Sequence, residues 1–556
     1  MKDFTLDDYI DKQAAISAID RFTQKHDMVR FDPSQKKYRE LIPQKDPDKG
    51  QQYAFEVDLD KCTGCKACVV ACHSENGLDE EEAWRSVGLI QGGSVSNPAI
   101  QHVTSACHHC LEPACMNGCP TMAYTKDPHT GIVKHLDDQC FGCQYCILKC
   151  PYDVPKYSKA KGIVHKCDMC IDRLKDKQAP ACARACPNGA INITIVDTQE
   201  VRKNPAEFVK IPDAPASDYT FPTTKYITKK RFPSNMASVD YFTLKPEHSH
   251  MPLVIMLVLT QLSVGAFLAL ALIKTYLYPQ YLQTFRFIHL PLALSIGLCA
   301  LAASIFHLGR PHLAFRAFLG VRTSWLSREI IAFGGFAKLA IIYAVAIFLP
   351  GIEKFLVGTF GRHVLDIVMW LVVACGMAGI LCSVMVYRDT RRPFWDNHST
   401  TAKFLLSSVI LGAGLTLLTS MVFGALHPDV SFSYLRDNFG FPLGKIICAA
   451  SIVKMLIEAS VFLVNDDGHF SFIRKSAMLM ARQLMVSTLW RFGCGITGGV
   501  LLPALFMGLG DASKTGVYVV FSFMILVLLL AGELLERYLF FKAVVPLKMP
   551  GGISID

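Results

Sequence analysis

The chain has 556 residues, 51% of them hydrophobic, and a formal net charge of +9. A composition this apolar excludes an ordinary soluble enzyme and predicts a membrane protein. The basic residues cluster in short loops between apolar segments, so membrane topology explains the charge and nucleic-acid binding is not indicated. The long apolar segments all follow residue 250, which divides the chain into a cysteine-rich part and a membrane part.

Residues 1–50 are predicted to be an N-terminal extension without an export signal, because no basic stretch leads into an apolar run and no twin-arginine pair occurs. Apolar residues recur at roughly helical spacing from Asp7 to His26. This pattern predicts an amphipathic helix that packs either on its own domain or on a partner.

Of the 21 cysteines, 16 lie between residues 62 and 186, in four segments of four. In a C-x-x-C-x-x-C loop, three thiolates reach three irons of one cluster, and the fourth cysteine, often followed by proline, binds a neighbouring cluster. Zinc ribbons also use C-x-x-C pairs, but they need two pairs for one ion and not nested runs of four. The spacing predicts four [4Fe-4S] clusters in a domain over 51–199, with the ligands Cys62, Cys65, Cys68, Cys72, Cys107, Cys110, Cys115, Cys119, Cys140, Cys143, Cys146, Cys150, Cys167, Cys170, Cys182 and Cys186.

The residues between the second and third segments predict a short hairpin of a ferredoxin-like repeat, with Thr130 and Gly131 at its turn. The expected fold of this part is therefore α+β. Six prolines among polar residues then predict an extended linker over 200–250.

Eight apolar segments reach the length that spans a bilayer and predict an all-α membrane anchor over 251–545, followed by a tail over 546–556. The predicted spans are 251–273, 287–309, 329–351, 363–387, 401–426, 443–464, 489–509 and 515–541.

An even number of spans returns the chain to the side on which the cysteine-rich part lies. That side carries about 19 flanking Lys and Arg residues against about 7 on the other, and basic flanks remain in the cytoplasm. We therefore expect a multi-pass protein of a bacterial-type inner membrane with its clusters in the cytoplasm.

Residues 55–195, with their four cysteine segments, resemble the four-cluster iron-sulfur subunit of the dimethyl sulfoxide reductase group of molybdopterin enzymes. The resemblance implies that the first and fourth segments share two clusters and that the second and third share two. Cysteine at position 115, where some relatives carry another residue and a three-iron cluster, implies four-iron clusters throughout. The implied ligand sets are Cys62, Cys65, Cys68 and Cys186; Cys72, Cys167, Cys170 and Cys182; Cys107, Cys110, Cys115 and Cys150; and Cys119, Cys140, Cys143 and Cys146.

The loop SIFHLGRPHLAFRAFLGVRTSWLSREI, between the second and third spans, resembles the quinol-binding region of the membrane anchor of the same enzymes. The resemblance implies that His307 and Glu329 act in quinol oxidation. Arg310 is a candidate for binding the quinol, and its alternatives are holding the loop or binding a lipid phosphate. Both His307 and Glu329 are expected at the membrane face nearest the clusters. A structural histidine at the membrane interface is the alternative for His307.

Other ionisable residues within the spans are either functional, as such costly groups usually are, or structural. Lys454 and Glu458 lie four residues apart on the sixth span, which predicts a self-neutralising ion pair. Glu533, Glu536 and Arg537 would reach the interface or form a proton exit.

A membrane haem would need two histidines at matched depth. His289, His363 and His427 are all expected near the membrane face opposite the clusters, whereas His307 is alone on the near side. No haem is expected, because the resembled anchor carries none.

No stretch supplies a molybdopterin site, a nucleophilic triad or a phosphate-binding loop, so the substrate of the complex is expected to react on another polypeptide. The sequence thus predicts an iron-sulfur subunit fused to its membrane anchor. It would oxidise menaquinol or ubiquinol and pass electrons to a molybdopterin-containing catalytic subunit. Two alternatives remain: quinone reduction driven by formate or a sulfur compound, and a redox-driven ion-translocating protein.

Overall fold

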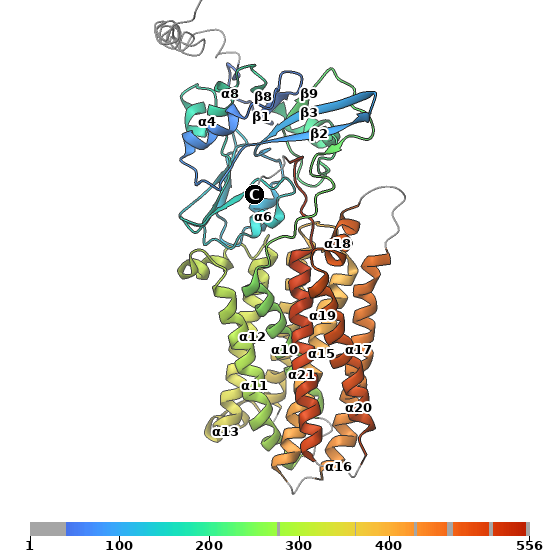
Figure 1. The fold of residues 1–556 in the computed structure, drawn as a ribbon. Coiled ribbons are helices and arrows are strands. Elements are labelled where there is room, and N and C mark those ends of the chain that lie inside the picture. The colour runs from blue at the N-terminus through green and yellow to red at the C-terminus, as the bar shows by residue number, and fades with distance from the viewer. Residues whose placement is uncertain are drawn as a thin grey trace, which may run out of the picture.

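The computed structural model describes residues 41–274, 279–361, 363–427, 431–463, 471–510 and 515–551. Over this part of the chain a cysteine module (residues 41–250) sits on one end of a bundle of long helices, the membrane module (residues 251–551) (Figure 1). The amphipathic helix predicted between Asp7 and His26 lies outside the described residues.

The cysteine module contains small sheets joined by short helices, as the predicted α+β ferredoxin-like fold requires. Antiparallel strands β1 (Gln51–Asp58) and β8 (Ile191–Asp197) bring its two ends together, and β2 (Ser86–Ser94) pairs with β3 (Asn97–Ser105). The predicted hairpin forms from β4 (Tyr124–Lys126) and β5 (Val133–His135), with Gly131 at φ +70° in its turn. A matching hairpin, β6 (Lys156–Ser158) and β7 (Ile163–His165), follows the third cysteine segment.

The four cysteine segments share one backbone conformation. The residue that precedes the second cysteine of each segment has a positive φ: Gly64 (73°), His109 (40°), Gly142 (75°) and Met169 (61°). Non-glycine residues rarely adopt this conformation, so its fourfold recurrence marks a repeated local requirement. Each turn precedes or begins a short helix or helical turn that carries further cysteines, including α4 (Ala67–Asn76), α5 (Ala114–Gly118), α6 (Tyr145–Lys149) and α8 (Ala181–Arg184).

The predicted linker is tied to the cysteine module. It begins with α9 (Thr198–Lys203) and contains β9 (Lys225–Ile227), which adds to β1, and β10 (Ala237–Ser238), which adds to β2. Backbone hydrogen bonds to these strands hold a proline-rich segment that the composition alone would leave extended.

The membrane module contains eight candidate spans within the described residues, at the places the sequence predicted. They comprise α10 (Met251–Ile273), α11 (Pro279–Ile305), α12 (Trp325–Phe348), α14 (Val364–Arg388), α15 (His398–Leu426), Phe432–Leu463 with α16 (Phe432–Leu435) and α17 (Phe441–Ala459), Met485–Gly508 with α19 (Met485–Ile496) and α20 (Leu502–Gly508), and α21 (Thr515–Lys542). The short helices α13 (Pro350–Phe360) and α18 (Phe472–Ala481) lie between spans.

Helices α10 and α15 form the centre of the bundle. Of the residues in their apolar windows 72% are buried, against 28% in α11, whose outer face is left for lipid. A Cβ atom at Gly265 would lie 2.0 Å from the Ser408 carbonyl oxygen, so glycine permits the close contact of these two helices.

The two modules are joined by hydrogen bonds at the loop between α11 and α12. The Arg310 N–H donates to the Phe141 carbonyl at 3.0 Å, and the Gly320 N–H donates to the Pro120 carbonyl at 2.8 Å. The Ser324 hydroxyl donates to the Gly118 carbonyl at 2.7 Å. This loop therefore holds the segments that carry Cys119 and Cys140.

The chain after α21 turns back into the cysteine module. The Leu89 N–H donates to the Gly551 carbonyl at 3.4 Å, and Lys548 pairs with Asp240. Residues 545–551 thus add a second connection between the modules, besides the chain that enters α10 (Figure 1). The remaining residues of the predicted tail, 552–556, lie outside the described part.

Candidate functional site

Eight of the sixteen cysteines line two separate cavities. One cavity is lined by Cys62, Cys65, Cys68 and Cys186, and another by Cys107, Cys110, Cys115 and Cys150. These are two of the four sets that the family resemblance implies, and each combines cysteines far apart in sequence.

Burial and neighbouring cysteines also raise thiol pKa values among the cysteines of the other two implied sets. Burial raises the pKa of Cys72 to about 12, and the charges of Cys182 and Cys170 raise it further. Burial likewise raises the pKa of Cys146 well above its ordinary value, as do the charges of Cys143, Cys119 and Cys140.

No group of three or more His, Cys, Asp or Glu side chains among the described residues closes around a single metal ion. A four-iron cluster separates its thiolates more widely than one ion does.

Hydrogen-bond donors around the thiols suit ligands of negative charge. The Ala123 N–H donates to the Cys119 sulfur, and the Ala190 N–H donates to the Cys186 sulfur, both at 3.2 Å. The Val133 N–H donates to His109 Nδ1 at 3.0 Å, so a neutral His109 ring carries its hydrogen on Nε2. That buried Nε2 has no acceptor in the protein, and a cluster sulfur would supply one.

The cysteine sets extend from the membrane face to the far end of the module. Helix α6, with Cys146, lies at the end next to the bundle, whereas α4 and α8 lie at the opposite end (Figure 1). Tyr145, between Cys143 and Cys146, packs into the hydrophobic core of the bundle. At the other end Cys65 is exposed.

Glu329 is buried in the second turn of α12, with 4% of its surface exposed. It accepts a hydrogen bond from the Ser383 hydroxyl of α14. Tyr145 also contacts α14, because its hydroxyl donates to the Val386 carbonyl of that helix at 2.9 Å. Burial raises the pKa of Tyr145, and the charges of Asp389, Tyr219 and Glu329 raise it further. Ser383 and Val386 lie three residues apart on α14, so Glu329 and Tyr145 bond neighbouring turns of that helix.

His307 lies in the turn after α11, which ends at Ile305 and not at residue 309 as predicted. Its Nδ1 donates to the Ser304 carbonyl, which leaves Nε2 as the basic nitrogen of the neutral ring. Burial lowers the pKa of His307, and the bond to Ser304 partly offsets this effect.

His307 and Glu329 are not hydrogen-bonded to each other; their partners are Ser304 and Ser383. His250, which the sequence analysis did not single out, is a further histidine in this region, and His307 is among the groups that affect its pKa. Burial lowers the pKa of His250 to about 4, and the charges of His248, His307 and Arg392 lower it further. The spacing of H-S-H directly before the first span was the signal available in the sequence.

Arg310, the candidate for binding quinol, is engaged by the cysteine module. Its Nη1 donates to the Asp137 carbonyl at 2.9 Å, and its Nε donates to the Lys161 carbonyl at 3.2 Å. These contacts give it a role in docking the two modules.

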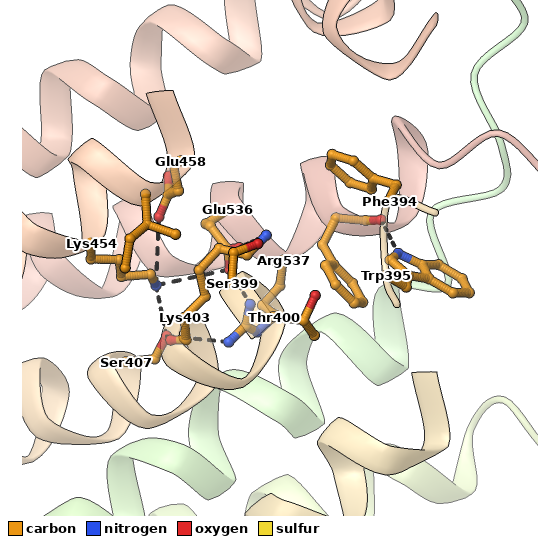
Figure 2. Close-up of polar contacts among 12 residues, drawn as sticks. Phe394, Trp395, Ser399, Thr400, Lys403, Ser407, Lys454, Glu458, Glu536 and Arg537 are labelled. Carbon is orange, nitrogen blue, oxygen red and sulfur yellow. Dashed lines mark hydrogen bonds and ion pairs between the residues drawn. The ribbon is translucent and has the colours of Figure 1, made fainter. Parts of the chain in front are cut away.

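A buried charge network joins α15, α17, α19 and α21, and Figure 2 shows the part of it around Lys403, Lys454, Glu458 and Glu536. Lys454 lies within 4 Å of three carboxylates: Glu533, Glu458 at 3.8 Å and Glu536 at 3.9 Å. Arg491 holds Glu458 through two hydrogen bonds, at 2.7 and 2.9 Å. The predicted Lys454–Glu458 ion pair is therefore present, and it forms part of a larger network that the spacing did not predict.

The rest of the network is equally buried. Lys403 lies 3.7 Å from Glu536, and Arg537 donates to Gln261 and Ser407 at 3.2 Å each. Lys403, Arg491 and Arg537 belong to the flanking basic residues on which the predicted orientation rests, yet each is at most 5% exposed. They do not act as loop charges, and the remaining flanks still carry the basic excess.

His289, one of the three histidines expected near the far membrane face, is fully buried. Its Nδ1 is bonded to the Thr419 hydroxyl at 2.9 Å, and its Nε2 donates to the Ala266 carbonyl at 3.1 Å. Both ring nitrogens thus have partners within the protein.

Sequence comparisons agree with this division of the chain. Residues 246–542 match the family described as DMSO reductase anchor subunit, and residues 53–74 and 99–196 match a 4Fe-4S binding domain and a 4Fe-4S dicluster domain. The protein is 36% identical to the B subunit of anaerobic dimethyl sulfoxide reductase from Haemophilus influenzae, over 31% of its own length and 87% of that subunit. It is 34% identical to the B subunit of the Escherichia coli enzyme, over 31% and 86% of the two lengths.

A more distant similarity involves another class of complex. The protein is 33% identical to the iron-sulfur subunit of the nitrate-inducible formate dehydrogenase of Escherichia coli, over 26% of its own length and 56% of that subunit. The iron-sulfur module is therefore similar to subunits from more than one type of oxidoreductase.

The charge network yields a first test. Replacing Lys454 with Met removes the cation that three buried carboxylates share and leaves an excess of buried negative charge, so we expect a loss of about 3–5 kcal/mol in the free energy of unfolding. The additional change Glu533→Gln should recover part of this loss, because it removes one of these negative charges. Thermal unfolding in lipid nanodiscs measures both effects, with Lys354→Met on the exposed helix α13 as control. Equal stability of the Lys454 and control variants would contradict a structural role of the network.

Proposed function

We propose that this protein, which belongs to the family of DMSO reductase anchor subunits and carries a 4Fe-4S module like the B subunit of that enzyme, oxidises membrane quinol. The electrons from the quinol would pass through four [4Fe-4S] clusters to a separate molybdopterin-containing catalytic subunit. The established part of this description is a multi-pass membrane protein with an iron-sulfur electron-transfer module. The quinol site, the number of clusters, the direction of electron flow and the partner are proposals.

The proposal rests chiefly on the position of Glu329. This buried carboxylate accepts a hydrogen bond from Ser383 of α14, and Tyr145, which is flanked by Cys143 and Cys146, bonds Val386 three residues further along the same helix. Ionisable groups inside membrane helices are costly and are usually functional. A carboxylate held at the base of a cysteine loop is well placed to act on a substrate whose electrons leave through that loop.

Quinol oxidation releases two protons and two electrons, so the site needs proton acceptors. His307 has a free basic Nε2 when neutral, and its lowered pKa keeps the ring neutral at physiological pH. Glu329 can accept the second proton, and the hydrogen bond from the Ser383 hydroxyl holds its carboxylate in position. The exposed apolar side chains of Phe306, Phe315 and Phe318 suit a loop at the lipid interface, where quinol would enter.

The bound clusters would supply one-electron carriers between the bilayer and the far end of the module. Residues 62–68 at that end include the exposed Cys65, which marks the face where a catalytic partner could come closest. The terminal substrate would then be selected by the partner. If His307 and Glu329 release their protons on the side that receives the electrons, turnover moves no net charge across the membrane.

The reverse direction is a second candidate, favoured by the similarity to a formate dehydrogenase iron-sulfur subunit. In that case the same residues would deliver protons to quinone. An ion-translocating role would instead use the buried network of Lys454 and Glu533, whose mutual pairing favours a structural role.

Metal content tests the proposed cluster number. Sixteen ligands in four sets predict about 16 iron atoms per chain after anaerobic purification. Cys143→Ser should perturb one cluster and interrupt electron flow, while the eight spans still insert. A value near 12 in the unmodified protein, or zinc in place of iron, would contradict four [4Fe-4S] clusters.

Quinol-dependent reduction of the clusters tests the site. We expect His307→Ala and Glu329→Gln to slow it by about 100-fold or more, because each removes a proton acceptor. Reduction by dithionite should be unchanged, since it bypasses the quinol site. His312→Ala, an exposed histidine of the same loop, is the matched control.

The pH dependence gives an additional check on His307. Its base form is the neutral ring, and burial lowers its pKa from 6.5. The unmodified protein should therefore keep its rate of cluster reduction as pH falls to 6.5 and lose it only below that value. Normal quinol oxidation in both His307→Ala and Glu329→Gln would place the quinol site elsewhere.

Orientation is tested with reporters. The basic flanks predict that the C-terminus and the cysteine module are cytoplasmic. A C-terminal alkaline phosphatase fusion, active only in the periplasm, should be inactive, and a fluorescent reporter that matures in the cytoplasm should be active. The opposite pair of results would place the clusters in the periplasm.

A further inference from the structure

Two cations are buried among the cysteine sets without a carboxylate partner. Arg85 and Lys166 are each only 2% exposed. Neither forms an ion pair with an Asp or Glu among the described residues, although most other buried cations of the chain do. Burying an unpaired charge is strongly unfavourable, so each cation requires a compensating negative group.

Arg85 lies between two cysteine sets. Its Nη1 donates to the Thr104 hydroxyl at 3.2 Å, and that hydroxyl lies 3.6 Å from the Cys68 sulfur. Its guanidinium stacks over Phe55, with 4.7 Å from Cζ to the ring centroid. Nε and Nη2 are buried donors without any protein acceptor. The nearest charges that stabilise the cation are those of Cys182, Cys68, Cys167 and Cys72.

Lys166 likewise lies between two cysteine sets. Its Nζ donates to the Cys107 sulfur at 3.6 Å and to the Cys167 carbonyl at 2.8 Å, and it also bonds the Val133 carbonyl. Cys107 and Cys167 belong to different sets. Lys166 therefore bridges the set of Cys107 and the set of Cys167.

The two cations flank the same set of cysteines, Cys72, Cys167, Cys170 and Cys182. A [4Fe-4S] cluster with four thiolates carries a net negative charge that grows by one on reduction. The orphaned donors of Arg85 and the ammonium of Lys166 match such an acceptor in sign and in hydrogen-bonding chemistry, so the surrounding residues fit the group.

We propose that Arg85 and Lys166 are redox-tuning residues, which raise the reduction potentials of the clusters they lie between and make the doubly flanked cluster a favoured position for the electron. This inference rests on the proposed four-cluster function. A fixed positive charge in a region of low dielectric favours the reduced, more negative cluster, and net charge and hydrogen bonds to sulfur are known determinants of cluster potential.

Redox-poised EPR spectroscopy of the purified full-length protein tests the proposal. In Arg85→Met, a substitution that keeps length and removes charge, we expect the equilibrium constant for reduction of the affected clusters to fall about tenfold. For a one-electron couple this is a shift of about 59 mV to lower potential. Lys166→Met should lower the reduction potentials of an overlapping set of clusters, because one cluster lies beside both cations. The potentials of Arg85→Lys should stay close to those of the unmodified protein.

The exposed Arg202 provides the matched control, because Arg202→Met removes a cation of the same module at its surface. Iron content and the EPR signals of the unmodified protein are measured first, so a failure of the four-cluster assignment is recognised separately. Full iron content with unchanged potentials in both Met variants would overturn the proposal. Loss of iron in both, with full iron in Arg85→Lys, would also overturn it, because the cations would then serve assembly alone.

Discussion

An electron can leave the bilayer only where a redox group of the cysteine module comes close to the membrane, so the rest of the architecture depends on how the Cys140–Cys150 loop docks on the bundle. Glycines at this contact allow backbone to meet backbone. A Cβ atom at Gly309 would lie 2.0 Å from the Gly162 carbonyl oxygen, and one at Gly320 would lie 2.6 Å from that of Cys119. Lys149 adds a 2.7 Å ion pair with Asp389. The loop after α11 thus binds the Cys140–Cys150 loop of the cysteine module. In the proposed function it also forms one wall of the quinol site.

The chain handles buried charge in two different ways. In the bundle, Lys454 and Arg491 are surrounded by carboxylates from neighbouring helices, which satisfies the charges internally and fixes how α17, α19 and α21 pack. In the cysteine module, Arg85 and Lys166 have no carboxylate and face thiols. The first arrangement is complete within the protein. The second requires a negative group that the polypeptide does not provide, which is why it points to clusters.

Fusion of the two modules adds constraints that separate subunits would lack. The segment before α10 adds strands to β1 and β2, and the segment after α21 reaches β2 again. The chain is therefore tied to the cysteine module both before it enters the first span and after it leaves the last. Such double attachment limits rotation between the modules and keeps Tyr145 above Glu329.

The sequence by itself determined the features that depend on local spacing. Nested cysteines indicated iron-sulfur clusters and the eight apolar segments predicted the bundle, whereas His307 and Glu329 followed from the resemblance of their loop to a quinol-binding region. Contacts between distant segments were decided only by the tertiary structure. Arg310 proved to be a docking residue, Lys454 shares three carboxylates, and Tyr145 joins the clusters to the bundle, because these partners are brought together by helix packing that no spacing rule encodes. The cations of Arg85 and Lys166 were equally invisible in sequence, since a buried charge is recognised only by its surroundings.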